Sequence, residues 1–174
     1  QKLRDCIELV NSRHPNLRSP ATQVFQGVVG NLDCTRHFEV FNSYNQIARQ
    51  CYSCFKTQLN LPNIIELIKV MLAFRLSHFP QNNPRKCMIE SRPGVSGSYK
   101  AFIYSNSFDE AKFVEKQLYK LHYCIDFEIK VKRGCTEYLE SYPEFADVDA
   151  DGNLKINYDE SKEQFETLVK SGTL

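Results

Sequence analysis

The residues best suited to chemistry in this sequence are four of its seven cysteines. Cys51 and Cys54 form a Cys-x-x-Cys pair, a spacing at which two thiolates commonly bind a zinc ion. Cys135 and Cys87 are the candidates that would complete a tetrahedral site with them. Because the sequence holds no second Cys-x-x-Cys pair, buried or redox-active thiols are the alternative interpretation. Zinc is therefore the one cofactor that the sequence suggests.

Basic residues flank these cysteines along the chain. They form a candidate anion-binding group made of Arg49, Arg85, Lys86 and Arg133. Positive charge attracts anions and lowers the pKa of a neighbouring thiol. A thiol- or metal-dependent enzyme that acts on a small anionic substrate at the Cys51, Cys54 and Cys135 end is therefore one hypothesis. The sequence does not identify catalytic residues for it.

A second candidate site is a set of lysine and aromatic residues at alternate positions of the expected strands. Its members are Lys56, Lys100, Phe102, Tyr104, Lys130 and Lys132. Alternate strand residues point to the same face, so these side chains should share the face of the sheet turned away from the helices. Aromatic rings among lysines on a sheet are how RNA-recognition modules stack bases and neutralise phosphates. If the terminal segments cover this face, Phe102 and Tyr104 belong to the core instead.

The segments that must position both sites alternate between strand and helix periodicity. Strands are expected over 54–59, 87–92, 99–105 and 127–132, and helices after Pro62 and from a capping box at Ser107. The first helix is apolar around so much of its circumference that it should be mostly buried. This β-α-β-β-α-β order predicts an α+β, ferredoxin-like core over 50–136, with sheet order 4-1-3-2 and both helices on one face.

This topology predicts that the cysteines meet. Strands one and two begin at the end of the sheet where strand four finishes, so that end should hold Cys51, Cys54, Cys87 and Cys135. Strands one and four are neighbours about 5 Å apart, so the last of these should approach the first two. Cys87 lies two strands away, so Cys34 or His37 could supply a missing ligand.

The passage from the third strand into the second helix resembles that of RNA-recognition modules. It runs from Phe102-Ile103-Tyr104 to Asp109-Glu110-Ala111. It departs from their pattern because no Lys/Arg-Gly-aromatic sequence precedes it. In addition, Ser105 stands where those modules usually carry an aromatic residue. The resemblance implies RNA binding through the open sheet face.

Composition and charge limit the classes of protein to which this chain can belong. The chain has 174 residues, of which 42% are hydrophobic and 25% charged, as in an ordinary globular domain and unlike a collagen-like or disordered chain. No apolar run approaches the length of a membrane span, and irregularly spaced cysteines favour reduced thiols in the cytoplasm. Residues 137–174 carry ten acidic and three basic side chains, an acidic tail behind a basic body. Residues 1–49 are expected as a helical extension packed on the core.

Together these features favour a binding module over an enzyme. We expect the basic, aromatic sheet face to bind an anionic partner, above all single-stranded RNA, and the cysteine-rich corner is a candidate zinc site. A protein-interaction domain that reaches a protein partner through the acidic tail is a further hypothesis. No membrane partner is expected.

Overall fold

The computed structural model describes residues 23–26, 34–79, 81–91 and 95–146, together with Ser12, Val148, Asp149, Asp151, Lys155 and Ile156. Its elements are β1 (Gln23–Gln26), α2 (Cys34–Tyr44), α3 (Arg49–Tyr52), β2 (Phe55–Leu61), α4 (Ile64–Leu76), β3 (Arg85–Ile89), β4 (Tyr99–Ser105), α5 (Phe108–Leu118), η1 (Tyr119–Tyr123), β5 (Glu128–Arg133) and η2 (Pro143–Ala146). The part of the predicted helical extension before residue 23 lies outside the described residues, Ser12 apart. Among the described helices, none has both the length and the apolar character needed to span a bilayer.

The five strands form one antiparallel sheet in the order β1-β3-β4-β2-β5. The predicted strand order is confirmed, because β3-β4-β2-β5 is the order 4-1-3-2 read from the opposite edge. The α+β class is confirmed with it. The prediction of a helical segment over residues 1–49 is wrong for β1, which pairs with β3 from Gln23 opposite Met88 to Gln26 opposite Arg85. An edge strand has unpaired backbone groups that a short segment can satisfy, whatever its own periodicity.

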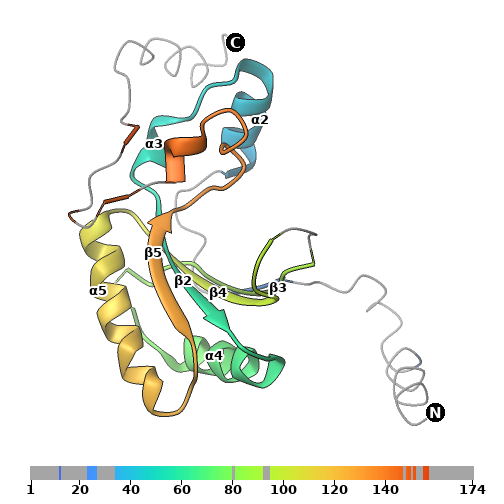
Figure 1. Cartoon of the computed structure of the whole chain (residues 1–174), viewed down its shortest axis with the longest axis vertical. Helices are drawn as coiled ribbons and strands as arrows, with labels where there is room; N and C mark the ends of the chain where they lie inside the picture. Colours follow the sequence, from blue (N-terminus) through green and yellow to red (C-terminus); the bar gives the residue numbers. More distant parts are fainter. Residues whose placement is uncertain are drawn as a thin grey trace.

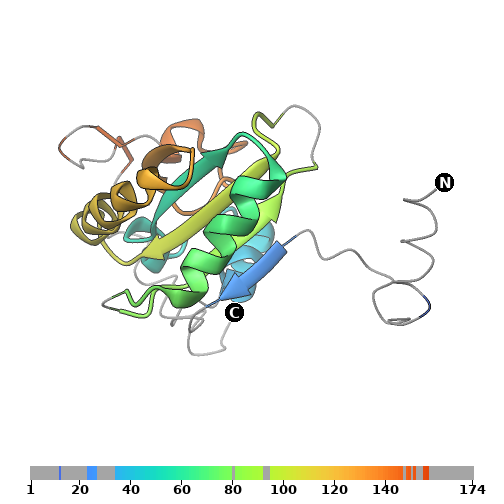
Figure 2. The ribbon, with the colours of Figure 1, turned by 90° about the horizontal axis from the view of Figure 1, so that it is seen from below.

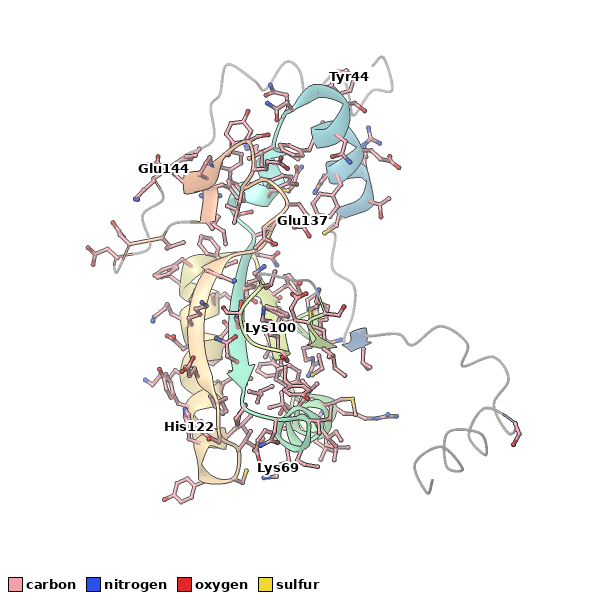
Figure 3. The ribbon with its side chains drawn as sticks, turned by 45° about the vertical axis from the view of Figure 1, so that its right-hand side comes forward. Tyr44, Lys69, Lys100, His122, Glu137 and Glu144 are labelled. Atoms are coloured by element: carbon pink, nitrogen blue, oxygen red, sulfur yellow. The ribbon has the colours of Figure 1, made fainter. Side chains whose placement is uncertain are left out.

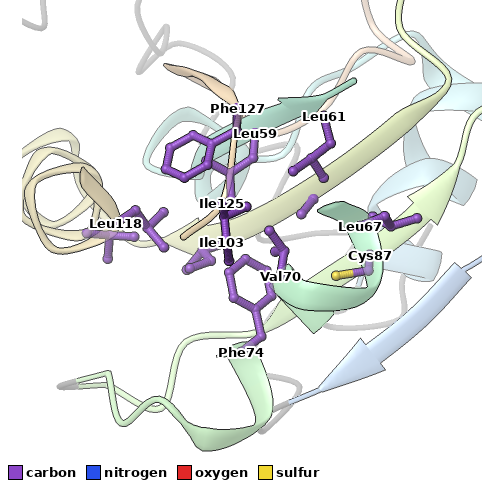
Figure 4. Packing of buried hydrophobic residues seen from close by; sticks show 12 residues of the cluster. Leu59, Leu61, Leu67, Val70, Phe74, Cys87, Ile103, Leu118, Ile125 and Phe127 are labelled. Carbon is purple, nitrogen blue, oxygen red and sulfur yellow. The ribbon is translucent and has the colours of Figure 1, made fainter. Parts of the chain in front are cut away.

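Helices α4 and α5 lie on the same face of the sheet (Figure 2). Between the helices and the sheet lies a core of Leu59, Leu61, Leu67, Val70, Phe74, Cys87, Ala101, Ile103, Val114, Leu118, Ile125 and Phe127 (Figure 4). Both helices begin with a side-chain cap. Asn63 accepts a hydrogen bond from the Glu66 backbone N–H at 3.0 Å, and Ser107 accepts one from the Glu110 backbone N–H at 3.1 Å. The predicted cap at Ser107 is confirmed.

Helix α4 is less buried than its apolar sequence predicts. Only its inner stripe of Leu67, Val70 and Phe74 is buried. The outer side chains Ile64, Ile65, Ile68, Leu72 and Leu76 are exposed. A helix that lies on one sheet can bury only the stripe that faces it, so the expectation of a mostly buried helix is wrong.

A second, smaller cluster lies beyond the end of the sheet, where α2, α3 and η2 meet (Figure 1). Its buried residues are Ile47, Ala48, Cys51, Tyr138 and Phe145. Residues 34–44 form the helix α2, which has no buried residue; its Phe38 and Phe41 pack against this second cluster. Residues 137–146 belong to this cluster and not to a solvated tail, since Tyr138 and Phe145 are 0% and 1% exposed. The large aromatic side chains are buried here, while the neighbouring acidic residues Glu137, Glu140 and Glu144 stay exposed.

Candidate functional site

The strand register places all six predicted contact residues on the face of the sheet opposite the helices. Thr57 points toward the helices, because its hydroxyl donates to the Ala111 carbonyl of α5 at 3.1 Å. Lys56, one position earlier, therefore points to the other side. It lies opposite Tyr104 on β4 and Lys132 on β5. The same face holds Lys86, Lys100, Phe102 and Lys130, and we call these seven residues the lysine face.

Phe102 is not the open stacking platform that the sequence suggested. Its side chain is 6% exposed, and the ammonium groups of Lys56 and Lys86 each lie 5.3 Å from the centre of its ring. Phe102 therefore holds two lysines by cation–π contact. Tyr104 is half-buried and is the aromatic residue of this face that remains partly open to a ligand.

The lysines of this face repel one another. Burial and the charges of Lys56, Lys130 and Lys100 lower the pKa of Lys132 to about 8. Among the described strand residues of the face, five are lysines and one, Glu128, is acidic. An anion placed among these ammonium groups would relieve their repulsion.

Two acidic residues outside the strands offset part of this charge. Glu90 lies 3.7 Å from the ammonium of Lys100, and both side chains are buried. Burial lowers the pKa of Lys56, and the neighbouring Cys135 and Glu137 oppose that effect. Lys100 lies over the middle of the sheet and Glu137 where the sheet meets the second cluster (Figure 3). The lysines of this face that are half-buried or exposed, and so accessible to a ligand, are Lys86, Lys130 and Lys132.

These accessible lysines are spread across the sheet. Lys86 and Lys130 lie on the same cross-strand row, separated by Phe102 and Gln58. The backbones of Lys86 and Lys130 are three strand spacings apart, about 14 Å. Lys130 and Lys132 are about 7 Å apart along β5. An extended set of this kind suits an anion with several charges in a chain.

Two of the four predicted anion-binding residues have structural roles instead. Arg85 is buried, and its guanidinium donates to the carbonyls of Phe74 and Ser77 at 2.6 and 2.8 Å, at the end of α4. Arg133 is 0% exposed and stacks on the rings of Tyr52, Phe55 and Phe145.

The two arginines occupy odd-numbered strand positions, which point toward the helices, so their prediction as anion ligands is wrong. Lys86 belongs to the lysine face. Arg49 is exposed at the start of α3.

Three of the predicted cysteines meet at the end of the sheet. Cys135 follows β5 and packs against the second cluster, to which Cys51 belongs. The Cys51 sulfur also lies 3.2 Å from the Tyr138 hydroxyl and 3.4 Å from His37 Nδ1. Cys54 lies beside Gly134, where a Cβ would come within 2.4 Å of its sulfur. We call this group the thiol corner, formed by Cys51, Cys54, Cys135, His37 and Tyr138.

Cys87 is not part of the thiol corner. It points toward the helices and packs in the main core, where burial raises its pKa to about 12 (Figure 4). β3 begins at Arg85, so Cys87 is in the middle of its strand and on the level of Ala101 and Leu59. The expectation that it lies with the other three thiols is wrong.

Among the described residues, the His, Cys, Asp and Glu side chains include no group of three or more placed to hold a metal ion. The six described cysteines are thiols, without a disulfide.

Sequence reasoning missed two members of these sites. The sequence neighbours of Lys86 suggest the cysteine end, whereas strand alternation predicts its observed position opposite Phe102. Tyr138 lies in the segment read as a tail, and the aromatic spacing of Tyr138, Tyr142 and Phe145 is the signal that could have revealed a packed segment.

Comparisons of the chain with protein-family models, with curated proteins and with solved structures found no match. No residue role is therefore transferred from another protein, and the function must be argued from the chemistry of this chain.

Proposed function

We propose that this protein is a binding module whose lysine face takes a polyanionic partner, single-stranded RNA. The observation that carries the proposal is the convergence of five lysines on one sheet face, where burial and the charges of the neighbouring lysines lower the pKa of Lys132 to about 8. A phosphate group near Lys132 would restore the stability of its charged form. The free energy lost in holding these charges together is thus recovered on binding.

An RNA single strand suits the shape of this surface. Its phosphates follow one another along a chain, as do the accessible lysines from Lys86 across to Lys130 and Lys132. The half-buried ring of Tyr104 is available for contact with one base, whereas Phe102 supports the lysines from beneath. We expect phosphate contacts to dominate affinity and sequence preference to be weak.

The proposal includes a ferredoxin-like layout for residues 55–133. The element order β2-α4-β3-β4-α5-β5 and the antiparallel pairings support it, as do the two helices on one face. This layout leaves the opposite face for a ligand.

Salt-dependent RNA binding tests the proposal. Fluorescence anisotropy with a labelled oligouridine should show binding whose logarithmic affinity falls linearly with the logarithm of salt concentration. In Lys130→Ala/Lys132→Ala the salt slope should shrink by about 1.4, because each phosphate contact to a single strand contributes about 0.7. The matched control Lys112→Ala/Lys116→Ala removes two lysines of α5, from the helix side of the sheet, and should leave the slope unchanged.

Binding that is absent at low salt, or that weakens equally in both double variants, would contradict the proposal. A thiol enzyme would instead turn over a small anionic substrate with no requirement for Lys130 or Lys132. A protein-interaction domain would bind a protein partner through the acidic tail of residues 137–174.

Zinc held by Cys51, Cys54 and Cys135 stays a prediction, and so does a cytoplasmic location. Elemental analysis of the purified protein tests the zinc prediction. One zinc per chain would support it, and its absence from protein purified without chelators would contradict it.

A further inference from the structure

Three aromatic rings around η1 lie nearly parallel to one another. The Tyr119 and His122 rings have centres 5.5 Å apart and an interplanar angle of 26°, and the His122 and Phe127 rings have centres 3.9 Å apart and an angle of 23°. The other ring pairs between described residues meet at 54° or more, as is common in protein cores. We call Tyr119, His122 and Phe127 the ring stack.

The local backbone explains why these rings stack. η1 (Tyr119–Tyr123) is a 3₁₀-helix, in which side chains three positions apart lie one above the other. Tyr119 and His122 have this spacing. Phe127 fixes the inner end of the stack, because it is 5% exposed and belongs to the main core. Helix geometry and core packing therefore order the rings in the absence of a ligand.

The outer end of the ring stack is accessible. One face of the Tyr119 ring lies against His122, yet the side chain of Tyr119 is 50% exposed. This exposure leaves room for a further planar ring to continue the stack. Because the protein rings are already in place, such a ligand does not have to order them on binding. The end of the stack at Tyr119 therefore suits a flat aromatic group.

The ring stack adjoins the lysine face. β5 begins at Glu128, directly after Phe127, and carries Lys130 two positions later. His122 lies near the end of the sheet where β5 starts, whereas Glu137 lies near the other end (Figure 3). β5 is at an edge of the sheet. A chain that crosses the lysine face to Lys130 can therefore continue round this edge toward Tyr119.

We propose that Tyr119 stacks on a base of the same RNA strand that crosses the lysine face. This inference rests on the function proposed above and adds a base-binding site to it. Aromatic side chains bind the bases of single strands in this way, and every base has a flat face to offer. The ring stack supplies the flat contact, and the lysine face supplies the phosphate contacts.

The charge around the ring stack is balanced. Two basic residues, Lys116 and Lys120, precede His122, and two acidic residues, Asp126 and Glu128, follow it. We therefore expect the contact at Tyr119 to depend on stacking, with little contribution from phosphate. Larger bases stack over more area, so oligoadenylate should depend on Tyr119 more than oligouridine does.

Fluorescence anisotropy with a labelled oligoadenylate tests the proposal. Tyr119→Ala should weaken binding about tenfold, because one base loses its stacking partner. Its salt slope should stay that of the wild type, because no phosphate contact is removed. Tyr119→Phe keeps the ring and should bind as the wild type does. The matched control Tyr123→Ala removes a tyrosine of the same element that is 100% exposed and outside the ring stack, and it should leave the affinity unchanged.

NMR spectra of the complex give a second readout that does not depend on affinity. The ring protons of Tyr119 should shift upfield at saturating oligoadenylate, because they come to lie over the ring current of a stacked base. The ring protons of Tyr123 should not move. Equal shifts of the two tyrosines, or none, would overturn the proposal.

The binding results separate this proposal from that for the lysine face. Salt-dependent binding that Tyr119→Ala leaves unchanged would overturn the base site alone, and so would equal weakening in Tyr119→Ala and Tyr123→Ala. Loss of affinity in Tyr119→Phe as large as in Tyr119→Ala would assign the effect to the hydroxyl and overturn stacking. A wild-type chain that binds neither oligoadenylate nor oligouridine at low salt would overturn both proposals.

Discussion

Lys132 reports on the electrostatics of the lysine face more directly than any other residue. Its pKa is lowered to about 8, first by burial and next by the charge of Lys56. We expect Lys56→Met to raise the pKa of Lys132 but to leave it below 10.5, because the burial remains. Lys100→Met should have a smaller effect, since Lys100 contributes less. A pH titration of the lysine side-chain signals by NMR measures this, and an unchanged pKa in Lys56→Met would contradict it.

The same residue makes stability depend on pH in a definite direction. The folded-state pKa of Lys132 is about 8 and its ordinary value is 10.5, so between these values the unfolded chain binds more protons. The contribution of Lys132 to the free energy of unfolding therefore rises with pH across this window. Lys132→Met should be more stable than the wild type near pH 7, and the difference should shrink by pH 10. Urea unfolding of both proteins at the two pH values checks this, and a constant difference would contradict it.

Gly134 is required by the close approach of the Cys54 side chain. A Cβ at position 134 would come within 2.4 Å of the Cys54 sulfur and 3.3 Å of its Cβ. Gly134→Ala should therefore lower the free energy of unfolding by about 1–3 kcal/mol. In a double-mutant cycle Cys54→Ala should recover part of that loss, because it removes the sulfur. Strict additivity in urea unfolding would show that the overlap is relieved in another way.

Among the secondary-structure elements, the N-terminal caps fix the residue at which each of the two long helices begins. Ser107 caps α5, and Glu110 accepts hydrogen bonds from the Asn106 backbone N–H and the Asn83 side chain, at 2.8 and 2.7 Å. Ser107→Ala should cost about 1 kcal/mol of unfolding free energy. The control Ser141→Ala, at an exposed turn, should change it by less than about 0.5 kcal/mol. Equal effects in chemical denaturation would contradict the assignment of Ser107 as a cap.

Helix α4 offers a matched pair of leucines that tests which of its faces is buried. Leu67 is 6% exposed and packs in the core, whereas Leu72 is 53% exposed. Leu67→Ala should cost about 2–5 kcal/mol. Leu72→Ala should cost less than about 1 kcal/mol, because the removed methyl groups are already in contact with water. Similar losses in the two variants would show that the outer face of α4 is covered.

Across the whole molecule, the elements that were predicted correctly are those with a strong local signal in the sequence. β4 spans the expected 99–105 because its alternation is uninterrupted, and α5 begins at its expected cap. The same alternation correctly placed Lys56, Lys130 and Lys132 on one face. Period and capping are local signals, so a single sequence carries them.

What the sequence could not show depends on partners that are distant along the chain. β1 exists because β3 offers an open edge, and Phe102 is buried because Lys86 of β3 lies over it. Tyr138 and Phe145 look like part of an acidic tail until α2 and α3 provide a surface for them. In each case tertiary packing decided the outcome against the local composition.

The most direct test of the account is a lysine footprint of the complex with oligouridine. Acetic anhydride modifies accessible amines, and mass spectrometry compares each lysine in the free and bound protein. Lys86, Lys130 and Lys132 should lose reactivity severalfold at saturating RNA, while Lys112 and Lys116 on α5 should keep theirs. Protection of the α5 lysines alone, or no protection of any lysine at saturation, would contradict RNA binding by the lysine face.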